Sequence, residues 1–145
     1  MQLPIFQMLY VSGAVGPVSE SSIDQILATS RRNNAVAGIT GLLLVADEIF
    51  VQVLEGDREA VLGLASRIRA DRRHRNFMVL VETQAAERAF GAWHMGFKRL
   101  DPGRAEDQVV FRATAAAINQ RIGRADGGLM LHAVLAFGRD MIASD

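Results

Sequence analysis

A short strand-like stretch at residues 50–56, with the sequence FVQVLEG, constrains the fold of this chain most strongly. Side chains of a strand alternate between its two faces, and both faces of this stretch are mostly apolar. That pattern is typical of a central strand that is covered on both sides. Gln52 is the exception, since a buried carboxamide without hydrogen-bond partners costs about 1–3 kcal/mol. A polar group must therefore meet Gln52 inside the protein, and a backbone group or a water molecule would be enough.

Hydrophobic periodicity divides residues 1–100 into five strands and two helices. The expected strands are 3–11, 38–45, 50–56, 77–82 and 90–100, and the expected helices are 19–33, beginning at Ser19 or Ser21, and 57–71. Strands two and three flank a tight turn and should form an antiparallel hairpin. The order of elements predicts an α+β fold of the ferredoxin-like βαββαββ type, a five-stranded mixed sheet with two helices on one face.

Residues 101–145 differ from the rest and form a C-terminal extension in this interpretation. Their pattern predicts two helices, 107–122 and 128–142, that separate at Gly127 and Gly128. The second of these helices is so apolar that it needs cover, either from the open face of the sheet or from another chain. We therefore expect one domain at residues 1–100 followed by a helical extension at 101–145.

Composition excludes several classes of protein. The chain has 145 residues, half of them hydrophobic, which suffices for one domain with a real core. Its 16 basic and 16 acidic residues balance, which argues against a general nucleic-acid binder. It has no cysteine, so disulfides, thiolate metal sites and thiol nucleophiles are excluded. No stretch is apolar enough to span a membrane and no signal sequence opens the chain, so we expect a cytoplasmic protein.

Polar side chains from four places should meet at one end of this sheet. The first and third strands would be central neighbours, which would bring Tyr10, the single tyrosine, next to Gln52. Asn34 follows the first helix, and Arg73 and His74 follow the second. A slot between these groups suits a flat, mostly apolar ligand with polar edges. No second histidine or carboxylate stands at a ligand spacing from His74, so we expect no metal site.

Six motifs together resemble the BLUF family, the blue-light sensors that use a flavin. They are Tyr10-Val11-Ser12, residues 30–34 (SRRNN), 38–43 (GITGLL), 50–56 (FVQVLEG), 71–74 (DRRH) and Trp93-His94-Met95. Their order and spacing both match, and the resemblance covers residues 1–100. It implies a photoreceptor without enzymatic activity that holds its flavin non-covalently. FAD is the first expectation, with FMN or riboflavin left open.

The resemblance also implies roles for individual residues. Tyr10 resembles the tyrosine that gives an electron and a proton to the excited flavin. Gln52 resembles the glutamine whose hydrogen bonds then rearrange, which gives a reversible red-shifted signalling state. Trp93 and Met95 resemble the pair on the fifth strand that responds to light, and which of them faces the flavin stays open. The expected flavin contacts are Tyr10, Ile26, Ser30, Arg31, Asn33, Asn34, Gln52, Asp71, Arg73 and His74.

The resemblance also implies a route by which the signal leaves the domain. The resemblance implies output through the fifth strand and the C-terminal helices to a separate partner protein, from a homo-oligomer. Residues 90–95 (FGAWHM) depart from the family pattern, because a proline-containing run before Trp93 and a serine after it are missing. Two alternatives use the same scaffold: a small hydrolase of the acylphosphatase type and a flavin-free interaction module. The hydrolase would need a glycine-rich phosphate loop after the first strand, which the sequence lacks.

Overall fold

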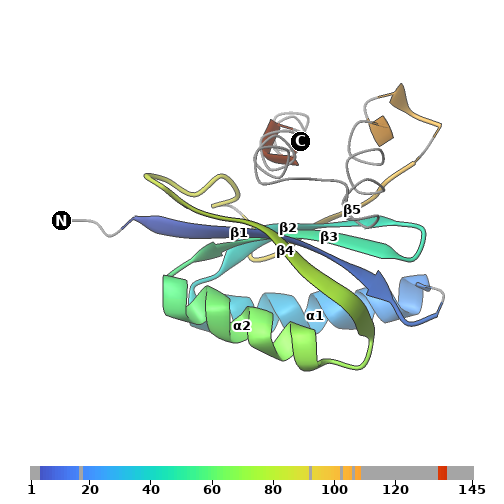
Figure 1. The fold of residues 1–145 in the computed structure, drawn as a ribbon, viewed down its shortest axis with the longest axis horizontal. Helices are drawn as coiled ribbons and strands as arrows, with labels where there is room; N and C mark the ends of the chain where they lie inside the picture. The colour runs from blue at the N-terminus through green and yellow to red at the C-terminus, as the bar shows by residue number, and fades with distance from the viewer. Residues whose placement is uncertain are drawn as a thin grey trace.

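The computed structural model describes residues 4–16, 18–91, 93–101, 103–105, 107–108 and 134–136. Five strands and two long helices follow in the expected order. They are β1 (Ile5–Ala14), α1 (Glu20–Ala37), β2 (Thr40–Ala46), β3 (Ile49–Gly56), α2 (Arg58–Ala70), β4 (His74–Ala85) and β5 (Gly96–Arg99). Both helices lie against one face of a mixed sheet, and residues 134–136 lie on the other side of it (Figure 1). The predicted α+β class and its ferredoxin-like layout are confirmed.

The sheet has the strand order β4-β1-β3-β2-β5, so β1 and β3 are central. β3 runs antiparallel to both β1 and β2, and β5 pairs parallel with β2 at the sheet edge. In the β1–β3 register Tyr10 lies directly opposite Gln52. The prediction that these two residues are neighbours on the central strands is therefore confirmed.

Each face of the sheet is covered by its own apolar cluster, because side chains alternate along every strand. The cluster beneath the helices includes Met8, Tyr10, Ile23, Leu27, Phe50, Leu54 and Val61. The cluster on the opposite face includes Leu9, Val11, Leu42, Leu44, Val51, Val53, Phe90 and Val134. A buried Val134 shows that the chain returns to cover this second face. The central strands are thus buried on both sides, as their composition indicated.

The first strand and the first helix are both longer than predicted. β1 continues through Gly13 to Ala14, and its pairing with β4 is irregular between Val11 and Gly13. A side chain at Gly13 would lie 3.0 Å from the side chain of Arg75, so glycine permits a close approach here rather than a chain break. The helix continues to Ala37 and stops at Gly38, which has the left-handed φ of 70° that glycine tolerates.

The N-terminus of α1 is capped by Ser19, the first of the two starts that the sequence allowed. The Ser19 hydroxyl accepts a hydrogen bond from the Ser22 amide at 3.1 Å. Ser21 and Asp24 are exposed and do not form the cap. At the other helix, Asp57 holds the N-cap position of α2 without a side-chain hydrogen bond.

The last two strands differ most from the prediction. β4 begins at His74 and ends at Ala85, so it extends three residues beyond the expected strand 77–82 at each end. β5 contains only Gly96–Arg99, and the expected strand at 90–100 is therefore wrong in its first half. There the Trp93 amide donates to the Phe90 carbonyl in a turn at 2.9 Å, which removes it from the ladder. Most of the predicted helices 107–122 and 128–142 lies outside the described residues.

Candidate functional site

A cavity of about 210 Å³ opens between the C-terminal halves of α1 and α2, above the helix-side face of the sheet. Nine of the ten residues expected from the sequence line it: Tyr10, Ile26, Ser30, Asn33, Asn34, Gln52, Asp71, Arg73 and His74. Six more lining residues were not expected: Thr29, Leu43, Phe50, Leu64, Arg67 and Ile68. The structure thus brings together polar groups that are up to 64 positions apart in the sequence.

A buried hydrogen-bonded chain begins at Tyr10 and Gln52 on the cavity wall and ends at Met95, which does not line the cavity. The Tyr10 hydroxyl donates to Gln52 Oε1, and Gln52 Nε2 donates to the sulfur of Met95 at 3.1 Å. Tyr10 is 1% exposed and its ring stacks on Phe77 with centroids 4.5 Å apart. Burial raises the pKa of the Tyr10 phenol, so it stays protonated at neutral pH. The buried carboxamide of Gln52 has therefore found the polar partner that its burial requires.

Met95, and not Trp93, is the residue that contacts Gln52. Met95 is buried in the helix-side cluster, whereas Trp93 packs in the cluster on the opposite face of the sheet. The Trp93 ring is stacked on Phe90 with centroids 6.2 Å apart, and it lies against the backbone of Gly96. Neither Trp93 nor Met95 lines the cavity, but Met95 is hydrogen-bonded to Gln52, which does. Met95 and Trp93, which the family resemblance pairs, therefore lie on opposite faces of the sheet.

The end of α1 holds the segment that carries Met95. Asn34, which is 1% exposed, donates from Nδ2 to the His94 carbonyl at 2.7 Å. Arg31 donates from Nε to the Met95 carbonyl at 3.0 Å. Arg31 is the one expected contact residue that does not line the cavity. Asn34 therefore touches both the cavity and the backbone next to Met95, while Arg31 touches that backbone alone.

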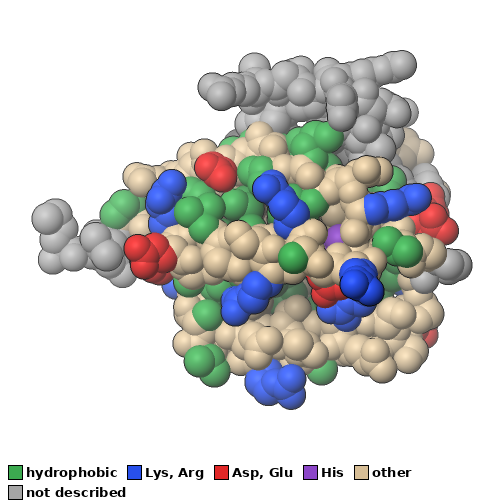
Figure 2. Space-filling model, turned by 60° about the horizontal axis from the view of Figure 1, so that its bottom comes forward, with side chains coloured by type: hydrophobic (Ala, Val, Ile, Leu, Met, Phe, Trp, Pro, Cys, Tyr) green, Lys and Arg blue, Asp and Glu red, His purple; other side chains and the backbone are tan. Residues whose placement is uncertain are grey.

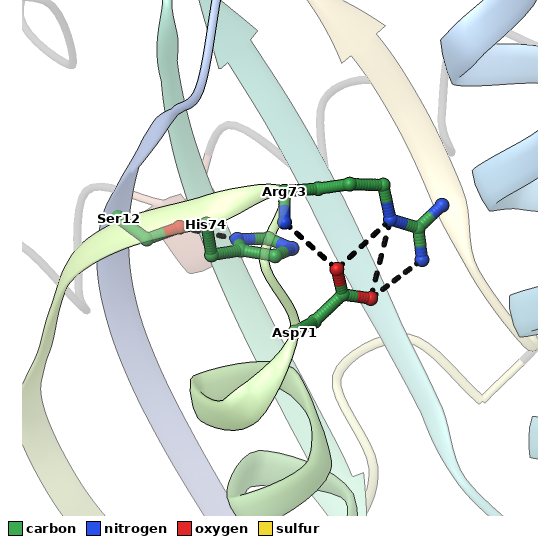
Figure 3. A network of polar contacts seen from close by, with 4 residues as sticks. All are labelled: Ser12, Asp71, Arg73 and His74. Carbon is green, nitrogen blue, oxygen red and sulfur yellow. Dashed lines mark hydrogen bonds and ion pairs between the residues drawn. The ribbon is translucent and has the colours of Figure 1, made fainter.

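A polar cluster closes the opposite end of the cavity, where α2 passes into β4 (Figure 3). The Arg73 guanidinium pairs with the Asp71 carboxylate at 2.7 Å and extends away from His74. This hydrogen-bonded arginine lowers the pKa of Asp71 to about 2. His74 meets Ser12 Oγ through Nδ1 at 2.8 Å, and its ring lies against Phe50. Burial lowers the pKa of His74, so the imidazole is neutral at neutral pH.

Four of the six unexpected lining residues form the apolar walls of the slot. Leu43 and Phe50 come from the central strands, and Leu64 and Ile68 come from one stripe of α2. Their spacing gives no sign of a ligand, because core and ligand-facing apolar residues have the same periodicity. Apolar walls with amide, imidazole and guanidinium groups at the ends fit a flat heterocycle with polar edges.

The face in Figure 2 carries charged side chains of both signs, with Asp and Glu side chains among the Lys and Arg side chains. In the described part of the chain, no three His, Asp or Glu side chains are placed to hold a metal ion. Among the residues that the structure describes, no helix is long and apolar enough to cross a membrane.

Comparison of the sequence with known families gives one clear match. The family profile described as "BLUF: Sensors of blue-light using FAD" matches residues 5–96. Photoactivated adenylate cyclase subunit beta of Euglena longa is 38% identical over 85 residues, which is 59% of this chain and 10% of that protein. The same subunit of Euglena gracilis is 39% identical over 83 residues, 57% of this chain and 10% of the relative. The chain thus spans about a tenth of the length of these relatives.

Comparison of the structure gives the same family over a larger share of the chain. BlsA in its photo-activated state superposes with a TM-score of 0.72 and 25% identity, covering 90% of this chain and 94% of that one. BlrB, a BLUF protein in the dark state, superposes with a TM-score of 0.70 and 25% identity, covering 92% of this chain and 96% of that one. A bacterial light-regulated adenylyl cyclase superposes with a TM-score of 0.69 and 30% identity, covering 80% of this chain and 34% of that protein.

Fold, cavity and comparisons agree. The family match covers well over half of the chain, and the matched domain is a light sensor that uses FAD rather than an enzyme. The slot between the helices suits the flat ring of such a chromophore. This chain therefore belongs to the BLUF family of blue-light sensors that use FAD.

Proposed function

We propose that this chain is a blue-light photoreceptor in which Tyr10 and Gln52 carry the primary light response. The observation that supports this is the buried chain Tyr10–Gln52–Met95, whose first two members line the cavity. Tyr10, Asn34, Gln52 and His74 would hold the flavin ring by its polar edges, with the apolar walls against its faces. When bound, the flavin supplies a strong one-electron oxidant on absorbing blue light.

Tyr10 is the natural electron donor in this arrangement, and its proton has a defined recipient. A phenol that loses an electron becomes a strong acid, and the Tyr10 hydroxyl already donates to Gln52 Oε1. A carboxamide has one acceptor end and one donor end, so Gln52 can take this proton and present a changed donor pattern after it rotates or tautomerises. The thioether of Met95 is a weak acceptor, so exchanging its bond to Gln52 Nε2 costs little.

The signal would leave through the segment that follows Met95. Gln52 contacts Met95 directly, and Met95 immediately precedes β5. β5 has four residues and lies at the sheet edge, where it pairs with β2 alone. Such a short edge strand is an element of low local stability that a small change can shift. Lys98 of β5 also forms an ion pair at 3.6 Å with Asp107, which is fully buried, and this links β5 to the residues after it.

We further propose that the recipient is a separate protein reached through residues 101–145. The names of the Euglena and bacterial relatives join the light response to an adenylate cyclase, and those proteins are far longer than this chain. Assembly into a homo-oligomer and a cytoplasmic location stay predictions. Size-exclusion chromatography with light scattering, in darkness and under blue light, measures the first of these.

The deciding measurement is the absorption spectrum of the purified protein before and after blue light. We expect a flavin spectrum that shifts slightly to the red on illumination and recovers in the dark. Tyr10→Phe should keep the flavin but abolish the shift, because the phenol that donates to Gln52 is gone. A normal light cycle in Tyr10→Phe contradicts the assigned role of Tyr10. A flavin that bleaches instead of shifting contradicts the proposed mechanism as a whole.

A further inference from the structure

Ser12 is the buried polar residue next to the cavity that the proposed function does not use. It is fully buried on β1, opposite Phe50 in the register with β3. Its hydroxyl lies 2.8 Å from Nδ1 of His74. His74 lines the cavity and Ser12 does not, so Ser12 stands behind the imidazole (Figure 3). Any influence of Ser12 on a ligand must therefore pass through His74.

The number of donors and acceptors on the two side chains indicates which of them donates the hydrogen bond. A neutral imidazole has one N–H and one lone pair, and a hydroxyl can either donate or accept. Within the described residues, His74 Nδ1 is the one hydrogen-bond partner of the Ser12 hydroxyl. If Nδ1 carried the proton, the Ser12 O–H would be a buried donor without an acceptor, which is the more costly arrangement. Ser12 therefore donates to Nδ1, and the imidazole proton is on Nε2.

The remaining contacts of His74 fix the ring in place. Phe50 lies against it with ring centroids 4.9 Å apart, and the His74 amide donates to the Asp71 carbonyl at 3.1 Å. The Arg73 side chain is turned away and bound to Asp71, so it does not compete for the imidazole. Nε2 has no hydrogen-bond partner among the described residues, while His74 itself lines the cavity.

We infer that Ser12 is a positioning residue that holds His74 in its Nε2–H tautomer, so that the imidazole offers a hydrogen-bond donor to a carbonyl oxygen of the ligand. This inference rests on the proposed function, because the carbonyl in question is the one at the edge of the flavin ring. Ser12 touches neither the cavity nor the ligand. It acts by choosing which of the two imidazole nitrogens carries the proton.

The first test reads the tautomer directly and does not depend on flavin. Long-range ¹H–¹⁵N spectra of the full chain, prepared without flavin, report the protonation of both imidazole nitrogens. We expect His74 to show an unprotonated Nδ1 and a protonated Nε2, and Ser12→Ala to show a mixture of both tautomers. A protonated Nδ1 in the unaltered protein overturns the inference, and so does an unchanged spectrum in Ser12→Ala.

The second test measures flavin affinity in a double-mutant cycle. Ser12→Ala should weaken flavin binding by about three- to tenfold, the range of one lost neutral hydrogen bond. In a His74→Phe background, which keeps a ring against Phe50, Ser12→Ala should leave the affinity unchanged. Ser12→Thr keeps the hydroxyl, so its imidazole spectrum and its flavin affinity should match those of the unaltered protein. An equal loss in both backgrounds overturns the positioning role, since Ser12 would then act on packing alone.

The two tests also separate this inference from the proposed function. If the unaltered chain binds no flavin, the photoreceptor proposal fails, while the tautomer measurement still decides the role of Ser12. If the chain binds flavin and shows the red shift, but Ser12→Ala changes neither tautomer nor affinity, the inference fails and the photoreceptor proposal stands.

Discussion

Two buried polar side chains three residues apart on β3 differ in how fully their hydrogen-bonding atoms are satisfied. Gln52 lies on the helix-side face and Glu55 on the opposite face. Gln52 makes one hydrogen bond from each end of its carboxamide, and one partner is the soft sulfur of Met95. Glu55, which is fully buried, accepts four hydrogen bonds. One site can exchange partners at small cost, and the other cannot.

The Glu55 network fastens the loop before β5 to the sheet. Its carboxylate accepts from the amides of Ala89 and Phe90 at 2.7 and 2.8 Å, and from the side chains of Gln7 and Thr40 at 2.8 and 3.0 Å. Bonds to a carboxylate are stronger than neutral ones, and four of them satisfy both oxygens. This loop leads to Trp93 and Met95. Glu55 therefore fixes the start of a segment whose far end contacts the adaptable Gln52.

The difference between the two sites shows how one strand can serve both order and change. A saturated, charge-assisted network makes every rearrangement expensive, because each donor left unpaired costs about 1–3 kcal/mol. A carboxamide with a weak acceptor keeps two arrangements close in free energy, which is what a two-state element needs. The following changes test this contrast, from the largest expected effect to the smallest.

Glu55→Gln should destabilise the fold most. The replacement keeps the shape but offers one carbonyl oxygen and an NH₂ group to four donors, so about 2–3 kcal/mol of unfolding free energy should be lost. Urea unfolding followed by circular dichroism measures it. Glu82→Gln, on the exposed side of β4, is the matched control and should change the value by less than about 0.5 kcal/mol. An equal loss of stability in the two variants would contradict the structural role of Glu55.

Gln52→Leu should abolish the light response with a smaller loss of stability. Leucine keeps the volume but leaves the Tyr10 hydroxyl without its acceptor, at a cost of about 1 kcal/mol. The flavin should remain bound while the reversible red shift disappears from the absorption spectrum. An unaltered shift in this variant shows that Gln52 is not the relay.

Met95→Leu should change the recovery rather than the existence of the light response. It removes the sulfur that accepts from Gln52 Nε2 and nearly conserves volume, so the fold should lose less than about 1.5 kcal/mol. Losing this bond destabilises the dark arrangement, so dark recovery should slow by up to about fivefold, the factor for 1 kcal/mol. Recovery is followed by absorbance after a flash. A rate equal to that of the unaltered protein shows that the sulfur contact does not bias Gln52.

Acidification should weaken the polar end of the cavity by a small amount. Burial lowers the pKa of His74 from its ordinary 6.5, so the unfolded chain binds this proton more readily than the folded one. The stabilising contribution is therefore complete above pH 6.5 and is lost as the pH falls towards the lower pKa of the folded state. Asp71, with a pKa of about 2, contributes no change in this range. Melting temperatures between pH 7 and 5 should fall less steeply in His74→Gln, and parallel curves would exclude His74 as the source.

Much of the site could be predicted because its residues break the pattern of the element that carries them. Gln52 interrupts an apolar strand and Asn34 continues an apolar helix stripe, so each indicated a buried polar role before its partner was known. The apolar walls gave no such signal, since Leu64 and Ile68 occupy positions that any core helix would fill with the same residues. Arg31 was expected at the cavity, but its guanidinium bonds to the Met95 carbonyl instead.

The sequence by itself determined the order of elements, the central place of β1 and β3 and the meeting of Tyr10 with Gln52. Those features depend on local periodicity and on the few topologies that such an order allows. Only the tertiary structure decided that Met95 faces Gln52 while Trp93 lies across the sheet, and that Ser12 stands behind His74. A hydrogen bond from the Trp93 amide to the Phe90 carbonyl and an irregular β1–β4 pairing between Val11 and Gly13 accompany these directions. The contacts of Ser12 with His74 and of Gln52 with Met95 join segments that are distant in the sequence, which no local pattern records.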